Sequence, residues 1–303
     1  MSSRAREPFV VSVPASSANL GPGFDAIGLA LELRVRATVT PAAHFTISFR
    51  AGAYAPTNAG FQNEIVRGLE RVLGEHPAVA IEVDNANPLG KGLGASAAGA
   101  VLGIAIGAEL AAERPVEREL AKHAAELEGH PDNALPALLG GVVIAAMPPE
   151  APPAYLRFDP PAGLSAVVVT PHIVLPTAAA RALLPATYDR RDVVYNLQRA
   201  ALLAASFASG DLSQVRVASG DRIHQPYRAP LVPGFDEMLA FERPGLAALA
   251  LSGAGPSVIA LVTSDGEAIG AAMQAAFARE GIDSDVFHLK IAPRGVTVER
   301  PTT

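Results

Sequence analysis

The sequence predicts an α+β fold in two units, and two observations indicate it. Strand-like alternating segments are mixed with segments of helical period, and the expected helices are grouped in pairs, which favours α+β over a doubly wound sheet. A proline-dense stretch, MPPEAPP at 147–153, interrupts the pattern. We therefore expect an N-terminal domain over residues 1–155 and a C-terminal domain over residues 156–303.

Periodicity predicts the elements of the N-terminal domain. Leu33 and Val35 belong to an alternating strand, whereas Ile65 and Leu69 repeat at the spacing of a helix face. The Pro-led segment from Pro115 starts a helix, because proline is favoured in a first turn. The expected elements are strands at 9–13 (ended by Pro14), 32–40, 45–50, 80–83 and 142–146, and helices at 63–73, 95–112 and 115–129.

The C-terminal domain is predicted in the same way. The expected elements are strands at 164–170, 246–251, 258–262 and 284–291, and helices at 192–208, 235–241 and 267–279.

Composition excludes several functional classes. The net charge of −6 gives no general basic surface for nucleic acid or an anionic membrane, so an anionic substrate needs a local site. The chain has no cysteine, which excludes disulfides, thiolate nucleophiles and cysteine-based metal sites. Its first residues, MSSRAREPFV, lack a long apolar region, so we expect a cytoplasmic protein without a secretory signal. The 17 uncharged residues between Lys91 and Glu109 are mostly small, which favours a buried core helix over a membrane span.

Residues 87–98, NPLGKGLGASAA, are the first candidate for a functional site. Gly90, Gly92 and Gly94 allow backbone N–H groups to approach an anion, and the expected helix directs its positive end to the same place. Ser96 lies in the first turn, where its hydroxyl is available to phosphate or Mg²⁺. A glycine turn with a serine cap explains the same letters equally well.

Two common phosphate motifs do not explain the glycine residues of this chain. A P-loop requires Gly-Lys-Ser/Thr, but Gly92 follows Lys91. Residues 21–26, GPGFDA, fit the letters of a dinucleotide fingerprint. Pro22 and the strand-like segment that follows do not fit its strand–turn–helix context.

Three motifs in order make the chain resemble the GHMP kinases, which include galactokinase, homoserine kinase, mevalonate kinase and phosphomevalonate kinase. They are PASSANLGPGFDAIGLAL at 14–31, NPLGKGLGASAA at 87–98 and LSGAGPS at 251–257. Within the family, ANLGPGFD, EGHPDNALPALLGG at 128–141, TAAARALLP at 177–185 and HQPYRAPLVPGF at 224–235 resemble the homoserine kinase branch. The resemblance implies an N-terminal domain like ribosomal protein S5 domain 2, a ferredoxin-like C-terminal domain and an active site between them.

The resemblance also implies roles for residues in ATP binding. The segment expected to wrap the ATP phosphates is Pro88, Leu89, Gly90, Lys91, Gly92, Leu93, Gly94, Ala95, Ser96, Ala97 and Ala98, and Asn63 is expected near the adenine. Ser96 and Glu128 match the Mg²⁺ ligands of the family. Ala95 replaces a serine that the family usually has, which removes one hydroxyl but leaves the backbone amides.

The implied acceptor substrate is L-homoserine, whose side-chain hydroxyl would receive the phosphoryl group of ATP. The residues matched to the amino acid are Asn19, Asp25, His130, Asp132, Asn133, Arg181, Arg228 and Ser252. The two arginines suit a carboxylate, because a guanidinium binds it as a fork. Taken singly, each arginine is more often a surface charge and His130 more often structural.

The family pattern also implies the reaction type. Asn133 stands where other GHMP kinases have an aspartate base, and it cannot take a proton, so it is expected to orient the hydroxyl while the γ-phosphate accepts the proton. The family implies a homodimer. The alternatives are another GHMP kinase with a different small alcohol and a non-catalytic member of the family that binds ligands.

Overall fold

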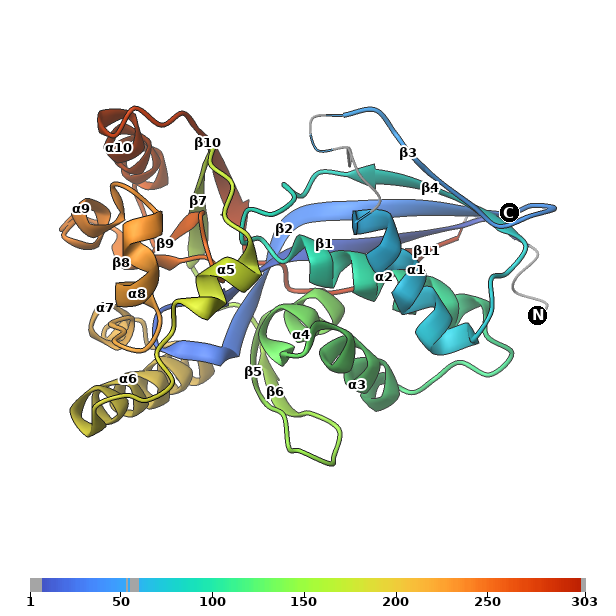
Figure 1. Ribbon diagram of the computed structural model, residues 1–303, viewed down its shortest axis with the longest axis horizontal. Coiled ribbons are helices and arrows are strands. Elements are labelled where there is room, and N and C mark those ends of the chain that lie inside the picture. The colour runs from blue at the N-terminus through green and yellow to red at the C-terminus, as the bar shows by residue number, and fades with distance from the viewer. Residues whose placement is uncertain (1–6, 53, 55–59, 301–303) are drawn as a thin grey trace.

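The computed structural model describes residues 7–52, 54 and 60–300 of the chain. In Figure 1 the molecule is elongated, with a larger sheet and helices α1 to α4 on one side and a smaller sheet with helices α6 to α10 on the other. Strand β2 runs from the neighbourhood of α6 into the larger sheet and so extends across both halves.

The larger sheet forms from the first half of the chain and a strand near its end. Its strands are β1 (Phe9–Asn19), β2 (Gly23–Pro41), β3 (Thr46–Phe49), β4 (Val79–Asn85), β5 (Val142–Ala146), β6 (Ala154–Phe158) and β11 (Thr297–Glu299). The order is β11-β1-β2-β4-β3, and β5 joins β2 to β6. All described pairings are antiparallel except that of β3 with β4.

The helices of the N-terminal half are α1 (Gly60–Leu73), α2 (Ala95–Leu110), α3 (Glu117–Glu128) and α4 (Pro131–Leu139). Helix α2 is buried along almost its whole length, as its small apolar residues predict. A Cβ atom on Gly103 would lie 1.9 Å from the carbonyl oxygen of Ile65, so glycine allows α1 and α2 to touch backbone to backbone. In the described part of the chain, no helix is long and apolar enough to cross a membrane.

The smaller sheet consists of β7 (Ser165–Pro171), β8 (Leu246–Leu251), β9 (Val258–Val262) and β10 (Ser284–Lys290) in the antiparallel order β10-β7-β9-β8. Its helices are α5 (Thr177–Ala182), α6 (Arg190–Ser209), α7 (Val215–Ala218), α8 (Gln225–Arg228), α9 (Phe235–Leu239) and α10 (Gly266–Arg279), with a 3₁₀ turn at Ala229–Leu231. One face packs on Phe207 of α6, and the other packs on Phe277 of α10. The expected α+β class is confirmed.

The prediction that Pro14 ends the first strand is wrong. Strand β1 continues to Asn19, and its register against β2 shifts between Pro14 and Ala15. An irregularity in the pairing accommodates a residue without an N–H donor, so the proline shifts the register without ending the strand. The extension carries the end of β1 and the start of β2 toward the C-terminal half.

Other elements also differ from the expected ones. The helix expected from Pro115 begins at Glu117, with Val116 as its N-cap residue. Helices α4, α5, α7 and α8 and strands β6 and β11 were not expected. Residues 20–22 connect the antiparallel strands β1 and β2, so GPGFDA at 21–26 lies in a hairpin and forms no dinucleotide fingerprint. The predicted boundary after residue 155 falls inside β6, and β11 returns to the larger sheet.

Candidate active site

A cavity of about 150 Å³ lies where segments of both halves meet. It is lined by the glycine loop before α2, the turn after β1, the ends of α3 and α4, helix α5, Arg228 of α8 and residues 253–254. The residues that the sequence singled out and that line it are Asn19, Asp25, Gly90, Gly92, Gly94, Ala95, Ser96, Glu128, His130, Asp132, Asn133, Arg181 and Arg228.

The backbone of the turn after β1 is strained where it enters the cavity. Asn19, Leu20 and Asp25 have φ angles of 70°, 50° and 55°, which non-glycine residues rarely adopt. The Asn19 side chain stabilises the turn, because its Oδ1 accepts from the Asp25 N–H at 3.0 Å and its Nδ2 donates to the Gly253 oxygen at 2.8 Å. Such outliers cluster at functional sites.

The glycine loop presents backbone to the cavity. Gly90, Gly92 and Gly94 all have positive φ angles, and α2 begins directly after Gly94. The unpaired N–H groups of the first turn of α2 and its dipole therefore favour an anion at this end of the cavity. This geometry supports the anion-binding interpretation of residues 87–98.

The loop is fixed in place by residues of the C-terminal half. The Ser252 hydroxyl donates to the Gly92 oxygen at 2.6 Å, and the Ser257 N–H donates to the Lys91 oxygen at 3.2 Å. The Lys91 ammonium donates to the oxygens of Pro171 and Ile173 at 2.8 and 2.7 Å, and burial lowers its pKa. The Lys91 side chain therefore links the loop to the end of β7 and is absent from the cavity lining.

Ser96 and Glu128 meet at the end of the cavity that the glycine loop lines. The Ser96 hydroxyl donates to Glu128 Oε1 at 2.8 Å, and the two residues come from the start of α2 and the end of α3. Burial raises the pKa of Glu128, and the Ser96 hydrogen bond opposes that rise. A hydroxyl and a carboxylate beside a phosphate-binding loop are oxygen ligands of the kind that Mg²⁺ takes.

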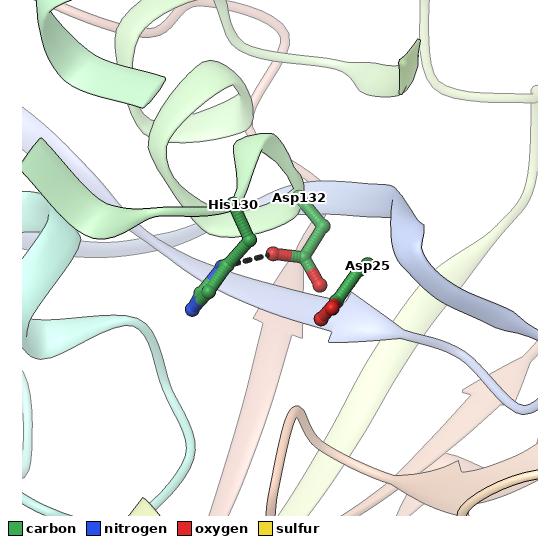
Figure 2. A group of neighbouring side chains, drawn as sticks. All are labelled: Asp25, His130 and Asp132. Atoms are coloured by element: carbon green, nitrogen blue, oxygen red, sulfur yellow. Dashed lines mark hydrogen bonds and ion pairs between the residues drawn. The ribbon is translucent and has the colours of Figure 1, made fainter. Parts of the chain in front are cut away.

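An acidic cluster lies on another wall of the cavity. Figure 2 shows Asp132 between His130 and Asp25, with the His130–Asp132 hydrogen bond dashed. His130 Nδ1 lies 2.6 Å from Asp132 Oδ1, and this hydrogen bond raises the pKa of His130. One ligand atom of each of the three residues lies within 4.8 Å of the others. Arg181 donates to both oxygens of Asp25, at 2.9 and 2.7 Å, and α4 presents Asp132 from its first turn. The cluster is suited to a cationic group.

Arg228 is a buried cation that lines the same cavity. Its side chain is 1% exposed, and in the described residues no carboxylate lies within 4.0 Å of its guanidinium. Its Nε donates to the Ala180 oxygen at 3.4 Å, and its Nη1 donates to the Gly253 oxygen at 3.3 Å. Burial lowers the pKa of Arg228, with Arg181 adding to the effect. A buried guanidinium that no described carboxylate contacts is suited to a bound anion.

Asn133 lies beside the glycine loop. Its Oδ1 accepts a hydrogen bond from the Ser16 hydroxyl at 3.0 Å. A Cβ on Gly94 would lie 2.0 Å from Ser16 Oγ and 2.9 Å from Asn133 Oδ1, so only glycine permits this approach. The Asn133 amide is thereby fixed near the start of α2.

Several predicted residues lie outside the lining. Asn63 is exposed on α1, and the buried Ser252 hydrogen-bonds Ser17 and Gly92 beneath the loop. The remaining ones are Pro88, Leu89, Lys91, Leu93, Ala97 and Ala98. Phe24, Thr177, Gly253 and Ala254 also line the cavity, although none of them was matched individually to ATP or to the substrate. All four lie in motifs already noted in the sequence, and these motifs were the sequence feature from which their place at the site could have been predicted.

Models of two protein domains match the chain. The GHMP kinases N terminal domain matches residues 62–141, and the GHMP kinases C terminal domain matches residues 201–279. Together the matches include the glycine loop, α3, α4 and α8.

Full-length relatives are also similar to this chain. The homoserine kinase of Solibacter usitatus is 40% identical over 298 residues, covering 96% of this chain and 97% of the relative. That of Moorella thermoacetica is 39% identical, covering 95% and 99%. The crystal structure of homoserine kinase from Cytophaga hutchinsonii superposes with a TM-score of 0.82 at 30% identity, covering 97% of this chain and 98% of that one.

Proposed function

We propose that this chain, which belongs to the homoserine kinases of the GHMP kinase family, transfers the γ-phosphoryl group of ATP to the side-chain hydroxyl of L-homoserine. The observation that carries the substrate assignment is the charge layout of the cavity. Arg228, which no described carboxylate contacts, and the cluster of Asp25 and Asp132 are matched to the two charged groups of an amino acid. The glycine loop beside them provides a place for phosphate.

The triphosphate of ATP would lie against residues 88–98. The backbone N–H groups of the loop and the positive end of α2 supply its binding energy, which explains why the absence of a hydroxyl at Ala95 is tolerated. The adenine would lie toward α1, where Asn63 is exposed.

Mg²⁺ fits the pair of Ser96 and Glu128. Their hydrogen bond shows that the hydroxyl and carboxylate oxygens reach the same point. A bound Mg²⁺ ion would neutralise charge on the β- and γ-phosphates. Glu128 would serve as its anionic ligand, and the Ser96 hydroxyl oxygen would serve as a neutral one.

Homoserine would lie between Arg228 and the acidic cluster. Arg228 binds its carboxylate, with Arg181 at the rim, while Asp25 and Asp132 bind its ammonium. His130 orients the Asp132 carboxylate through their hydrogen bond. The side chain of the substrate then extends toward Asn133 and the phosphate end of the cavity.

In the transfer, the substrate hydroxyl oxygen forms a bond to the γ-phosphorus while the bond from that phosphorus to the ADP oxygen breaks. The Asn133 amide orients the substrate hydroxyl but cannot act as a base. The hydroxyl proton therefore passes to an oxygen of the γ-phosphoryl group. Positioning and charge stabilisation provide the acceleration. The products are ADP and O-phospho-L-homoserine, an intermediate on the route to threonine.

A coupled assay of ADP release tests the activity. With Mg-ATP, we expect release that requires L-homoserine, with negligible rates for mevalonate and galactose. Turnover of mevalonate or galactose in preference to homoserine would identify a different GHMP kinase. Release with none of the alcohols would favour a ligand-binding role without catalysis.

We also propose that the protein is a homodimer in the cytoplasm, as its resemblance to the family implies. Sedimentation equilibrium measures the mass in solution, and for a homodimer we expect twice the chain mass of 31.2 kDa.

A further inference from the structure

His224 contacts Arg228 but is not among the residues that line the cavity. Its side chain is fully buried and stacks on Phe24, whose ring lines the cavity. Arg228 Nη1 lies 3.1 Å from His224 Nδ1, and His224 Nε2 lies 2.8 Å from the Gly21 oxygen. The imidazole therefore bridges the turn after β1 and the guanidinium.

These two contacts define the protonation state of the ring. A guanidinium can only donate, so His224 Nδ1 must present its lone pair to Arg228. The Gly21 carbonyl can only accept, so Nε2 must carry the hydrogen. The geometry requires the neutral Nε2–H tautomer, and burial lowers the pKa of His224 in agreement.

The charged groups around the ring match this state. Asp221 Oδ2 lies 3.5 Å from Nε2 but already accepts from the backbone N–H groups of His224 and Gln225. Arg228 opposes a positive charge on the ring, whereas Asp221 and the more distant Asp25 favour one. A second proton would place an N–H against the Nη1 group of Arg228 and break their hydrogen bond.

On the basis of the proposed function, we infer that His224 is a positioning residue for the substrate carboxylate: its Nδ1 lone pair holds Arg228 Nη1 and so aims the guanidinium into the cavity. In the described residues, Arg228 Nη2 makes no hydrogen bond, which leaves that edge of the fork for the substrate. The hydrogen bond to Gly21 keeps Nδ1 directed at Arg228. The GPGF turn thereby contributes to carboxylate recognition without contacting the carboxylate.

Two isosteric variants isolate this role. His224→Asn places an oxygen acceptor close to the position of Nδ1, whereas His224→Leu has nearly the same shape without an acceptor. Both lose the bond to Gly21. We expect His224→Leu to lower kcat/KM for L-homoserine about tenfold relative to His224→Asn, as the loss of a charged hydrogen bond does, with KM for ATP unchanged.

The same pair in an Arg228→Ala background provides the decisive comparison. If His224 acts through Arg228, the difference between the leucine and asparagine variants disappears there. A difference that persists without Arg228, or equal kcat/KM values with Arg228 present, would overturn the inference. The control is the same pair of substitutions at His288, whose ring lies against α10. His288→Asn and His288→Leu should have equal kcat/KM values for L-homoserine.

Two further checks keep the outcome interpretable. If circular dichroism shows that His224→Leu does not fold, His224→Gln replaces it, because its amide nitrogen reaches toward Gly21 while the Nδ1 acceptor is lost. Wild-type protein that does not phosphorylate homoserine would contradict the proposed function itself. An active enzyme without the expected pattern would contradict this inference alone.

Discussion

At residue 228 a guanidinium is buried, and within the described part of the chain no carboxylate contacts it. Burying a charge without such a partner is expensive. A protein tolerates it where a ligand completes the pair. The sequence alone could only match Arg228 to a family position, because its letters do not show burial. The structure adds the physical reason for the assignment.

Replacing Arg228 with alanine should weaken homoserine binding. We expect a loss of about 1.5–3 kcal/mol, or a roughly ten- to hundredfold rise in KM for homoserine, with KM for ATP unchanged. Steady-state kinetics with each substrate varied in turn measures both constants. Arg222→Ala, which removes an exposed arginine paired with Asp192, is the control. An unaltered KM for homoserine would remove Arg228 from the carboxylate site.

Glu128 is predicted to affect turnover more than substrate binding. Glu128→Gln keeps the shape but removes the anionic oxygen proposed for Mg²⁺, so we expect kcat to fall roughly a hundredfold, as it does when one group stabilising transition-state charge is lost. KM for homoserine should change little. Glu126→Gln, two residues earlier on α3 and paired with Arg71, should be near wild type. A wild-type kcat for Glu128→Gln would contradict the metal assignment.

At the scale of elements, strands and long helices were predictable because their periodicity is local. Helix α2 follows from its small apolar residues and from the glycine before it. Strand β1 beyond Pro14 was not predictable, because the register shift depends on its partner β2. Helix α4 was missed because Pro131 and Asp132 look like a turn until Pro131 is recognised as a first-turn residue.

The glycine loop allows a test that separates strain from contact. Gly90 and Gly92 both have positive φ, but a Cβ at Gly90 would enter open space, whereas one at Gly92 would lie 2.3 Å from the Ser252 oxygen. We expect Gly90→Ala to reduce the free energy of unfolding by roughly 1–2 kcal/mol. Gly92→Ala should cost about 1–3 kcal/mol more and also raise KM for ATP.

Chemical denaturation and ATP-dependent kinetics measure both variants. Equal losses of stability and equal KM values for ATP would show that the contact between the loop and residues 252–257 does not hold the phosphate site together.

At the scale of the whole molecule, the site exists only because two distant halves of the chain meet. The Asn19 amide reaches Gly253, and the Ser252 hydroxyl reaches Gly92, so loops of both halves form one cavity. Sequence periodicity does not predict such contacts between distant segments. The family motifs identified the site residues but not their geometry. His224 illustrates the limit, since its HQPYR motif was recognised but its contact with Arg228 requires the fold.

The most direct test of the account is the identity of the phosphorylated product. After incubation of the enzyme with Mg-ATP and L-homoserine, ³¹P nuclear magnetic resonance should show one new phosphomonoester signal coupled to the two protons of the side-chain CH₂ group, in step with ADP formation. ADP accompanied only by inorganic phosphate, or a phosphoryl group on the amine or carboxylate, would contradict the proposed placement of homoserine between Arg228 and the acidic cluster.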